Sequence, residues 1–251
     1  GALLGVCVLI RPVAAPLVGA LFVAWLLAGF GWRRALIHSA AVLGVTLLVV
    51  APWIVRNVRA MHAVTLSTNT GDNLCMSRHV GASGTFDFDN NACFIGFENI
   101  PRPDGETERD ARNRRLAIDF VRDHPGEEVK LWFKRIYQTF RSDWDGVWAV
   151  ESYGDSAFMS DSTRHTLRWL GTDYYLATLG LSAIGGVIVA RRRDEREARW
   201  AFIPLAIVAT VIVPVVTTFG DTRFKVPALP LFALVSAVPI VALANRVPRR
   251  S

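Results

Sequence analysis

The sequence predicts an all-α membrane helix bundle of about five full spans plus an N-terminal partial span, with one extracytoplasmic α-rich mixed domain. Its 251 residues are 51% hydrophobic and its mean hydropathy is +0.29, which is too apolar for an ordinary soluble globule. The charged residues, 20% of the chain, are spread so unevenly that long segments carry almost none. These observations exclude a cytosolic enzyme, a disordered tail and a small disulfide-bonded scaffold.

Five charge-poor runs are long enough to be membrane helices. A helix rises about 1.5 Å per residue, so roughly 20 apolar residues cross a hydrocarbon layer of ~30 Å. We therefore expect membrane helices in the runs 13–31, 35–55, 173–190, 200–219 and 226–245.

A shorter apolar run, 1–10, opens the sequence. It has neither an initiator Met nor a basic region before it, so it is unlike a signal peptide. The run predicts the second half of a membrane helix. We accordingly expect the chain to be the carboxy-terminal part of a larger polytopic protein.

The distribution of Lys and Arg predicts the orientation, because basic residues in short loops stay on the cytoplasmic side. Ten basic residues face only three acidic ones in the short connections around 33–34, 191–199 and 246–250. The long segment 56–170 holds 15 basic and 17 acidic residues, so it carries no signal for retention. The sequence therefore predicts a multi-pass protein of the plasma membrane whose basic loops report topology and do not bind nucleic acid.

This topology divides the chain into three domains. Residues 1–55 are expected to form N-terminal membrane helices, and residues 56–170 an extracytoplasmic domain. Residues 171–251 are expected to form a three-helix membrane segment with a cytoplasmic C-terminus.

The extracytoplasmic domain is expected to fold, because structureless connections of that length are uncommon. Residues 106–123 have a helix-forming composition that ends before Pro125. From about 126 to 141, apolar residues recur at every third or fourth position beside Lys130, Lys134 and Arg135. This amphipathic helix either lies in the membrane interface or packs against the rest of the domain.

Cys75 and Cys93 both fall in the predicted extracytoplasmic domain, where oxidation is possible. The sequence predicts a disulfide between them, worth roughly 3 kcal/mol in the chain-entropy model. Two free buried thiols are the alternative. Neither a nucleophile elbow nor a metal-ligand cluster stands out, so we assign no metal site and no cofactor, and the metal requirement of any reaction stays open.

Three cations stand at the predicted outer ends of membrane helices. Arg11 separates two apolar runs, where an arginine is costly unless it meets water, an anion or a carboxylate. Arg223 and Lys225 lie in the predicted outer turn between the last two spans. A guanidinium matches phosphate oxygens, so these cations predict a binding site for a lipid phosphate. The alternatives are a snorkelling Arg11 and an internal ion pair in the turn.

Several short motifs carry a resemblance to a known family through their shared order. They are Leu9-Ile10-Arg11-Pro12, Pro52-Trp53-Ile54-Val55-Arg56-Asn57, Ser67-Thr68-Asn69-Thr70-Gly71-Asp72-Asn73-Leu74, Val80-Gly81-Ala82-Ser83-Gly84, His124-Pro125 and Arg223-Phe224-Lys225-Val226-Pro227. Over nearly the whole chain, the sequence resembles the carboxy-terminal half of the GT-C superfamily of polytopic glycosyltransferases. Within it, the chain looks most like the dolichyl-phosphate-mannose protein mannosyltransferase and aminoarabinose transferase type found in bacterial membranes.

The resemblance implies an enzyme that moves a sugar from a polyprenyl-phosphate carrier to a glycan, lipid or protein acceptor at the extracytoplasmic face. The family's basic residue near the carrier phosphate falls on Arg11. Relatives often have a tyrosine flanked by arginine where this chain has Phe224, so Arg223 or Lys225 is expected to supply that contact.

The polar run after Thr68 also has a role in the family's pattern. We expect Asn69, Asp72 and Asn73 to face the sugar or the acceptor. The family's catalytic carboxylate lies in a first external loop near the amino terminus, which has no counterpart in this sequence. The resemblance therefore implies that no residue of this chain is the general base and that the 251 residues alone are inactive.

The alternative is a non-enzymatic polytopic membrane protein, either a lipid or solute transporter or an assembly scaffold. Both hypotheses predict the same spans. An acidic residue in a first external loop upstream favours the transferase, whereas an inverted repeat of the spans favours a transporter.

Overall fold

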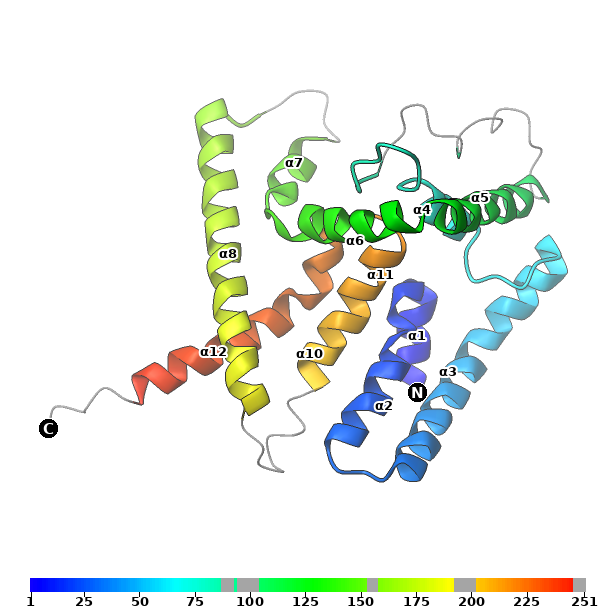
Figure 1. Ribbon diagram of the computed structural model, residues 1–251, viewed down its shortest axis with the longest axis horizontal. Helices are drawn as coiled ribbons and strands as arrows, with labels where there is room; N and C mark the ends of the chain where they lie inside the picture. Colours follow the sequence, from blue (N-terminus) through cyan, green and yellow to red (C-terminus); the bar gives the residue numbers. More distant parts are fainter. Residues whose placement is uncertain (87–92, 94–103, 153–157, 192–201, 246–251) are drawn as a thin grey trace, which may run out of the picture.

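The computed structural model describes residues 1–86, 93, 104–152, 158–191 and 202–245, and all regular secondary structure in these residues is helical. Most of the apolar helices stand roughly side by side, the last one crosses obliquely, and a group of more polar helices lies across one end of them (Figure 1). We call this second group the end layer. It consists of α4 (Thr70–Cys75), α5 (Asp104–Asp123), α6 (Pro125–Phe140) and α7 (Asp145–Ser152).

Three helices form the N-terminal part: α1 (Ala2–Ile10), α2 (Leu17–Leu27) and α3 (Trp32–Met61). α1 approaches α3 closely because Gly5 faces it, and a Cβ on Gly5 would lie 2.6 Å from Cβ of Val49. The turn after α2 uses Gly29 at φ 81°, a backbone angle that glycine adopts without strain. These glycines let the three helices pack as neighbours (Figure 1).

The C-terminal part is built on α8 (Asp161–Arg191) and α12 (Leu229–Ala244), which cross in close contact. A Cβ on Gly185 of α8 would overlap the carbonyl oxygen of Val235, and the Ser182 hydroxyl donates to the carbonyl of Phe232 at 2.6 Å. A third rod runs from α10 (Phe202–Ile207) through a π-helical turn (Val208–Ile212) to α11 (Val213–Thr217). It contributes to a core cluster of Val211, Val215, Ala228 and Phe232.

Three helices are long and apolar enough to cross a membrane, which is compatible with a membrane protein: Trp32–Met61, Asp161–Val189 and Thr222–Ala244. The runs 13–31 and 200–219, expected to be full spans, instead form the shorter apolar helices Pro12–Leu27 and Ile203–Thr217. At 1.5 Å per residue these are only about 24 and 22 Å long. Full length is therefore not confirmed for two of the five expected spans.

Local backbone geometry explains both short helices. The first ends at Leu27 because Gly29 turns the chain with a positive φ. The second ends at Thr217 because Thr218 leaves the helical region, with φ −111° and ψ −99°.

The expected extracytoplasmic domain contains the end layer. The two helices expected at 106–123 and 126–141 match α5 and α6, and no strand appears among the described residues of this segment. The structure joins Cys75 and Cys93 in a disulfide. The basic segments 192–201 and 246–251, on which much of the predicted orientation depends, lie outside the described residues.

Candidate functional site

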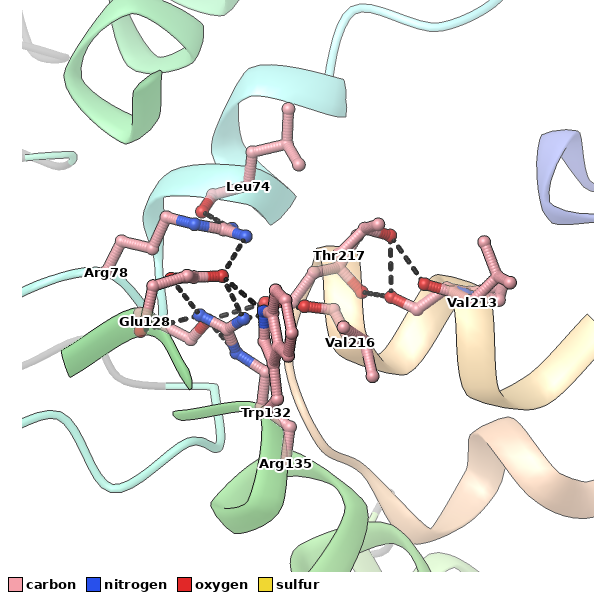
Figure 2. A network of polar contacts seen from close by, with 11 residues as sticks. Leu74, Arg78, Glu128, Trp132, Arg135, Val213, Val216 and Thr217 are labelled. Atoms are coloured by element: carbon pink, nitrogen blue, oxygen red, sulfur yellow. Dashed lines mark hydrogen bonds and ion pairs between the residues drawn. The ribbon is translucent and has the colours of Figure 1, made fainter. Parts of the chain in front are cut away.

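A buried ionic network fastens the end layer to the apolar helices. Figure 2 shows the Glu128 carboxylate of α6 between two guanidinium groups. Glu128 Oε1 lies 2.7 Å from Nη1 of Arg135 and 2.7 Å from Nη2 of Arg78. The Trp132 indole donates to the same oxygen at 3.1 Å. The Arg135 side chain is fully buried, and a buried charge is costly without a partner of opposite charge. Glu128 is that partner.

Arg135 also holds the chain segment that follows α11. Its Nη1 donates to the carbonyl of Val216 at 2.7 Å, and its Nε donates to the Ser77 hydroxyl at 3.0 Å. That hydroxyl donates in turn to the carbonyl of Thr218 at 2.5 Å. The backbone N–H of Gly220 donates to Gly84 at 2.7 Å. Residues 216–220 are thus fixed from the side of the end layer.

The pKa of the Glu128 carboxyl reflects this setting. Burial raises the pKa, but the hydrogen bond from Arg135 and the charges of Arg78 and Arg135 outweigh it, so the pKa lies below its ordinary value. Burial, followed by the charge of Arg135, lowers the pKa of the Arg78 guanidinium.

Stability should therefore depend on pH through Glu128. A carboxyl with a lowered folded pKa stabilises the fold above its unfolded pKa of about 4.3, and this stabilisation is lost as pH falls through the folded pKa. We expect the difference in thermal stability between the native chain and Glu128→Gln to shrink below about pH 4. Unfolding curves in detergent at a series of pH values measure it, and a constant difference down to the lowest pH would contradict it.

A cavity of about 560 Å³ opens beside this fixed segment, between the end layer and the apolar helices. Its walls combine one cation, several hydroxyl and amide groups, and apolar side chains. The lining residues are Ile10, Arg11, Pro12, Val13, Pro16, Ser67, Asn69, Thr70, Asn73, Thr210, Val213, Pro214, Thr217, Thr218, Phe219, Phe224 and Pro227. We call it the Arg11 cavity.

Arg11 follows the last turn of α1 and precedes Pro12, which favours an extended backbone in its predecessor. Its backbone is extended accordingly, with φ −144° and ψ 109°, and its N–H caps the helix through the carbonyl of Cys7 at 2.7 Å. The side chain is exposed, and among the described residues its guanidinium has neither a hydrogen bond nor an ion pair. An unpaired guanidinium next to hydroxyl and amide groups can bind an anion such as phosphate.

The structure brings together some of the residues expected at the site. Asn69 and Asn73 line the Arg11 cavity with Arg11 itself, as does Phe224 from the last turn. Arg223 stands beside Phe224 but does not line the cavity. Its side chain is exposed, pairs with Asp221 at 2.9 Å and lies over the Phe224 ring, which fits the alternative of an internal ion pair.

Asp72, expected with Asn69 and Asn73 to face the sugar or the acceptor, does not line the Arg11 cavity. Its side chain is buried between α4 and α5, where it accepts a hydrogen bond from Asn113 at 2.7 Å and pairs with Arg109 at 3.0 Å. Asp72 lies on the helical turn one position before Asn73, so the two side chains point in different directions. The carboxylate contributes to the packing of the end layer.

Lys225, expected at the lipid phosphate, does not line the Arg11 cavity either. Its side chain is fully buried, and Nζ donates to the carbonyl of Ser142 at 2.6 Å and pairs with Asp143 at 3.3 Å. The ammonium also lies 4.4 Å from the centre of the Tyr175 ring. The Lys225 ammonium thus makes its contacts with groups at the end of α6 and with a ring of α8.

Two threonines that the sequence did not single out also line the Arg11 cavity. Thr210 and Thr217 lie seven residues apart in an otherwise apolar run, a spacing that places both on one helix face. The sequence places Arg135 with Lys130 and Lys134 on the polar side of α6, so its burial was not expected. The spacing of Glu128, Leu131, Arg135 and Thr139, all buried, was the available signal.

The chemical resources of the site are therefore one cation and neutral polar groups. Among the described residues no group of three or more His, Cys, Asp or Glu side chains could hold a metal ion. Comparison with protein-family models, with curated proteins and with solved structures found no match for this sequence.

Proposed function

We propose that this chain forms the lipid-phosphate-binding part of an integral membrane glycosyltransferase, which moves a sugar from a polyprenyl-phosphate carrier to an acceptor at the extracytoplasmic face. The observation that carries the proposal is the position of Arg11. Its guanidinium, which has no hydrogen bond or ion pair within the described residues, stands at the end of an apolar helix and lines a cavity with neutral polar groups. The resemblance of the motifs to the GT-C superfamily agrees with this position.

The proposal includes a topology. Three long helices and two shorter apolar helices form a five-span membrane part, with α1 as a partial span, and the end layer lies on the extracytoplasmic side. The Arg11 cavity then sits where apolar helices meet polar ones, so a lipid can keep its chain in hydrocarbon while its phosphate reaches Arg11. Its sugar can reach the hydroxyl and amide groups.

The reaction would use the residues present as follows. A hydroxyl oxygen of the acceptor attacks the anomeric carbon of the sugar, and the bond from that carbon to the phosphate oxygen breaks. The leaving phosphate takes the electron pair, and the fixed charge of Arg11 stabilises it. Asn69 and Asn73 would orient the sugar or acceptor. The acceptor proton passes to a general base, which in the family that the motifs resemble is a carboxylate of an external loop.

The experiment is a binding measurement with the chain in detergent micelles and a short-chain polyprenyl phosphate as the probe. Arg11→Ala should weaken binding at least about tenfold, because a charge-assisted hydrogen bond contributes roughly 1.5–3 kcal/mol. Arg11→Lys should retain part of the affinity, since it keeps the charge and loses the fork of donors.

Arg34 provides the matched control, because it is an exposed arginine at the start of α3, a helix that contributes no residue to the Arg11 cavity. Arg34→Ala should bind as the native chain does. Equal losses in the Arg11 and Arg34 variants would indicate unspecific attraction and refute the site. Lipid-phosphate binding without sugar transfer by the complete protein would favour the alternative of a transporter or scaffold.

A further inference from the structure

A second, smaller cavity lies on α8, away from the Arg11 cavity. It has a volume of about 230 Å³ and is lined by Trp144, Arg168, Trp169 and Thr172. Trp144 precedes α7 in the end layer, and the other three residues lie on the first turns of α8. No residue is shared with the Arg11 cavity.

The Arg168 guanidinium is held in place by a ring and not by a counter-ion. It lies 4.8 Å from the centre of the Trp144 ring, so its flat face is occupied by the indole. Its Nε is buried without a hydrogen-bond partner, and no ion pair or hydrogen bond involves the side chain within the described parts of the chain. Asp143, the neighbour of Trp144, is paired with Lys225. The in-plane N–H donors of Arg168 are therefore oriented by the Trp144 ring and bind no described residue.

Thr172 adds a second donor to the same cavity. Its hydroxyl oxygen accepts a hydrogen bond from the backbone N–H of Asp143 at 3.4 Å, which leaves its proton free to donate. Donors from a guanidinium and from a hydroxyl, with no carboxylate among the lining residues, suit an oxyanion. A phosphate group matches the planar fork of arginine.

The position of Arg168 along α8 indicates where the phosphate comes from. The apolar stretch Asp161–Val189 has 29 residues, or about 44 Å, which exceeds a ~30 Å hydrocarbon layer. Its charge-free part begins after Asp173, five residues beyond Arg168, which is about 8 Å along the axis. Trp169 and Tyr174 are exposed at this level, as in the aromatic belts of membrane proteins.

We infer that the cavity of Trp144, Arg168, Trp169 and Thr172 binds the phosphate headgroup of an anionic phospholipid of the surrounding membrane. The inference rests on the membrane placement proposed above and is independent of donor binding at Arg11. The headgroup would bridge α8 and the segment before α7, and so hold the end layer against the membrane surface.

The test is native mass spectrometry of the full chain in detergent with short-chain phosphatidylglycerol as the probe. Arg168→Gln should lower the apparent affinity for the lipid about tenfold. Arg168→Lys, which keeps the charge but loses the fork, should fall between the two and serves if the glutamine variant does not fold. Arg141→Gln, at an exposed arginine after α6, is the matched control and should bind as the native chain does.

Two further measurements distinguish a phospholipid from free phosphate as the ligand, and the Arg168 site from the Arg11 site. Inorganic phosphate should not displace the lipid at equal concentration; if it binds as tightly as the phospholipid, the membrane source is refuted. Arg11→Ala should leave phosphatidylglycerol retention unchanged, whereas Arg168→Gln should leave polyprenyl-phosphate binding unchanged. Equal lipid retention by the native chain and by both Arg168 variants would overturn the inference.

Discussion

Glu128→Ala is expected to destabilise the end layer by about 3–5 kcal/mol, because it leaves two buried guanidinium groups without their shared carboxylate. The side chain of Arg135 has no exposed surface through which water could replace the lost partner. That of Arg78 is also nearly inaccessible. Two like charges held close together in a poorly solvated site repel each other, and a guanidinium stays protonated, so the fold must open locally and let water reach them.

Glu127 is a control on the adjacent position of the same helix. Its ion pair with Lys130 at 2.7 Å is exposed on both sides. Exposed pairs of this kind contribute at most about 1 kcal/mol, so Glu127→Ala should be nearly neutral. Thermal unfolding of both variants in the same detergent measures the contrast. Equal, small effects of the two substitutions would show that the Glu128 network is solvated and not structural.

Glu128→Ala should also disturb the Arg11 cavity, because Arg135 donates to the carbonyl of Val216 and the Ser77 hydroxyl donates to that of Thr218. Thr218 and Phe219 line the Arg11 cavity. Glu128→Ala should thus weaken polyprenyl-phosphate binding as well as stability. Limited proteolysis of residues around 216–220 would report the loosened segment directly.

The apolar helices could be predicted from the sequence, because the features that indicate them are properties of neighbouring residues. Length, lack of charge and the roughly 20-residue requirement depend only on neighbouring residues, and three of the five expected runs form full-length helices. The lengths of the other two depend on single turns, at Gly29 and Thr218, whose backbone angles are not specified by the apolar composition of the runs.

The site was only partly predictable, because burial is decided by elements distant in sequence. Arg11 was expected at the lipid phosphate and Asn69 and Asn73 at the sugar or the acceptor, and the structure places the three residues around one cavity. Asp72 was grouped with Asn73 by adjacency, but a helical turn rotates neighbouring side chains apart. Lys225 and Arg223 are both cations of the same short turn, so the sequence does not distinguish them. Lys225 is buried and Arg223 is exposed because α6 and α8 pack against one side of that turn.

Lys225 therefore supports a second large expected effect, on stability and not on donor binding. Lys225→Ala removes an ammonium that satisfies the carbonyls of Thr139 and Ser142 and pairs with Asp143. It also leaves a cavity beneath the Tyr175 ring. We expect a loss of about 2–4 kcal/mol, below the upper range for buried pairs because Asp143 is partly exposed and regains water.

Lys225→Met separates packing from charge, because methionine fills most of the volume without donating. It should cost less than alanine yet still destabilise, since two carbonyls lose their donor. Lys130→Ala, at an exposed lysine on α6, is the matched control and should be close to neutral.

The two cations that the sequence treated alike should thus behave in opposite ways. Arg11→Ala should weaken polyprenyl-phosphate binding with little change in thermal stability, because its guanidinium makes no bond within the described chain. Lys225→Met should lower the stability of the fold. The affinity of the folded variant for the probe should stay within about twofold of the native value, because a buried ammonium that donates only to groups of the protein makes no bond to the ligand. A stable Lys225→Met chain that no longer binds the probe would mean that Lys225 reaches the phosphate after all.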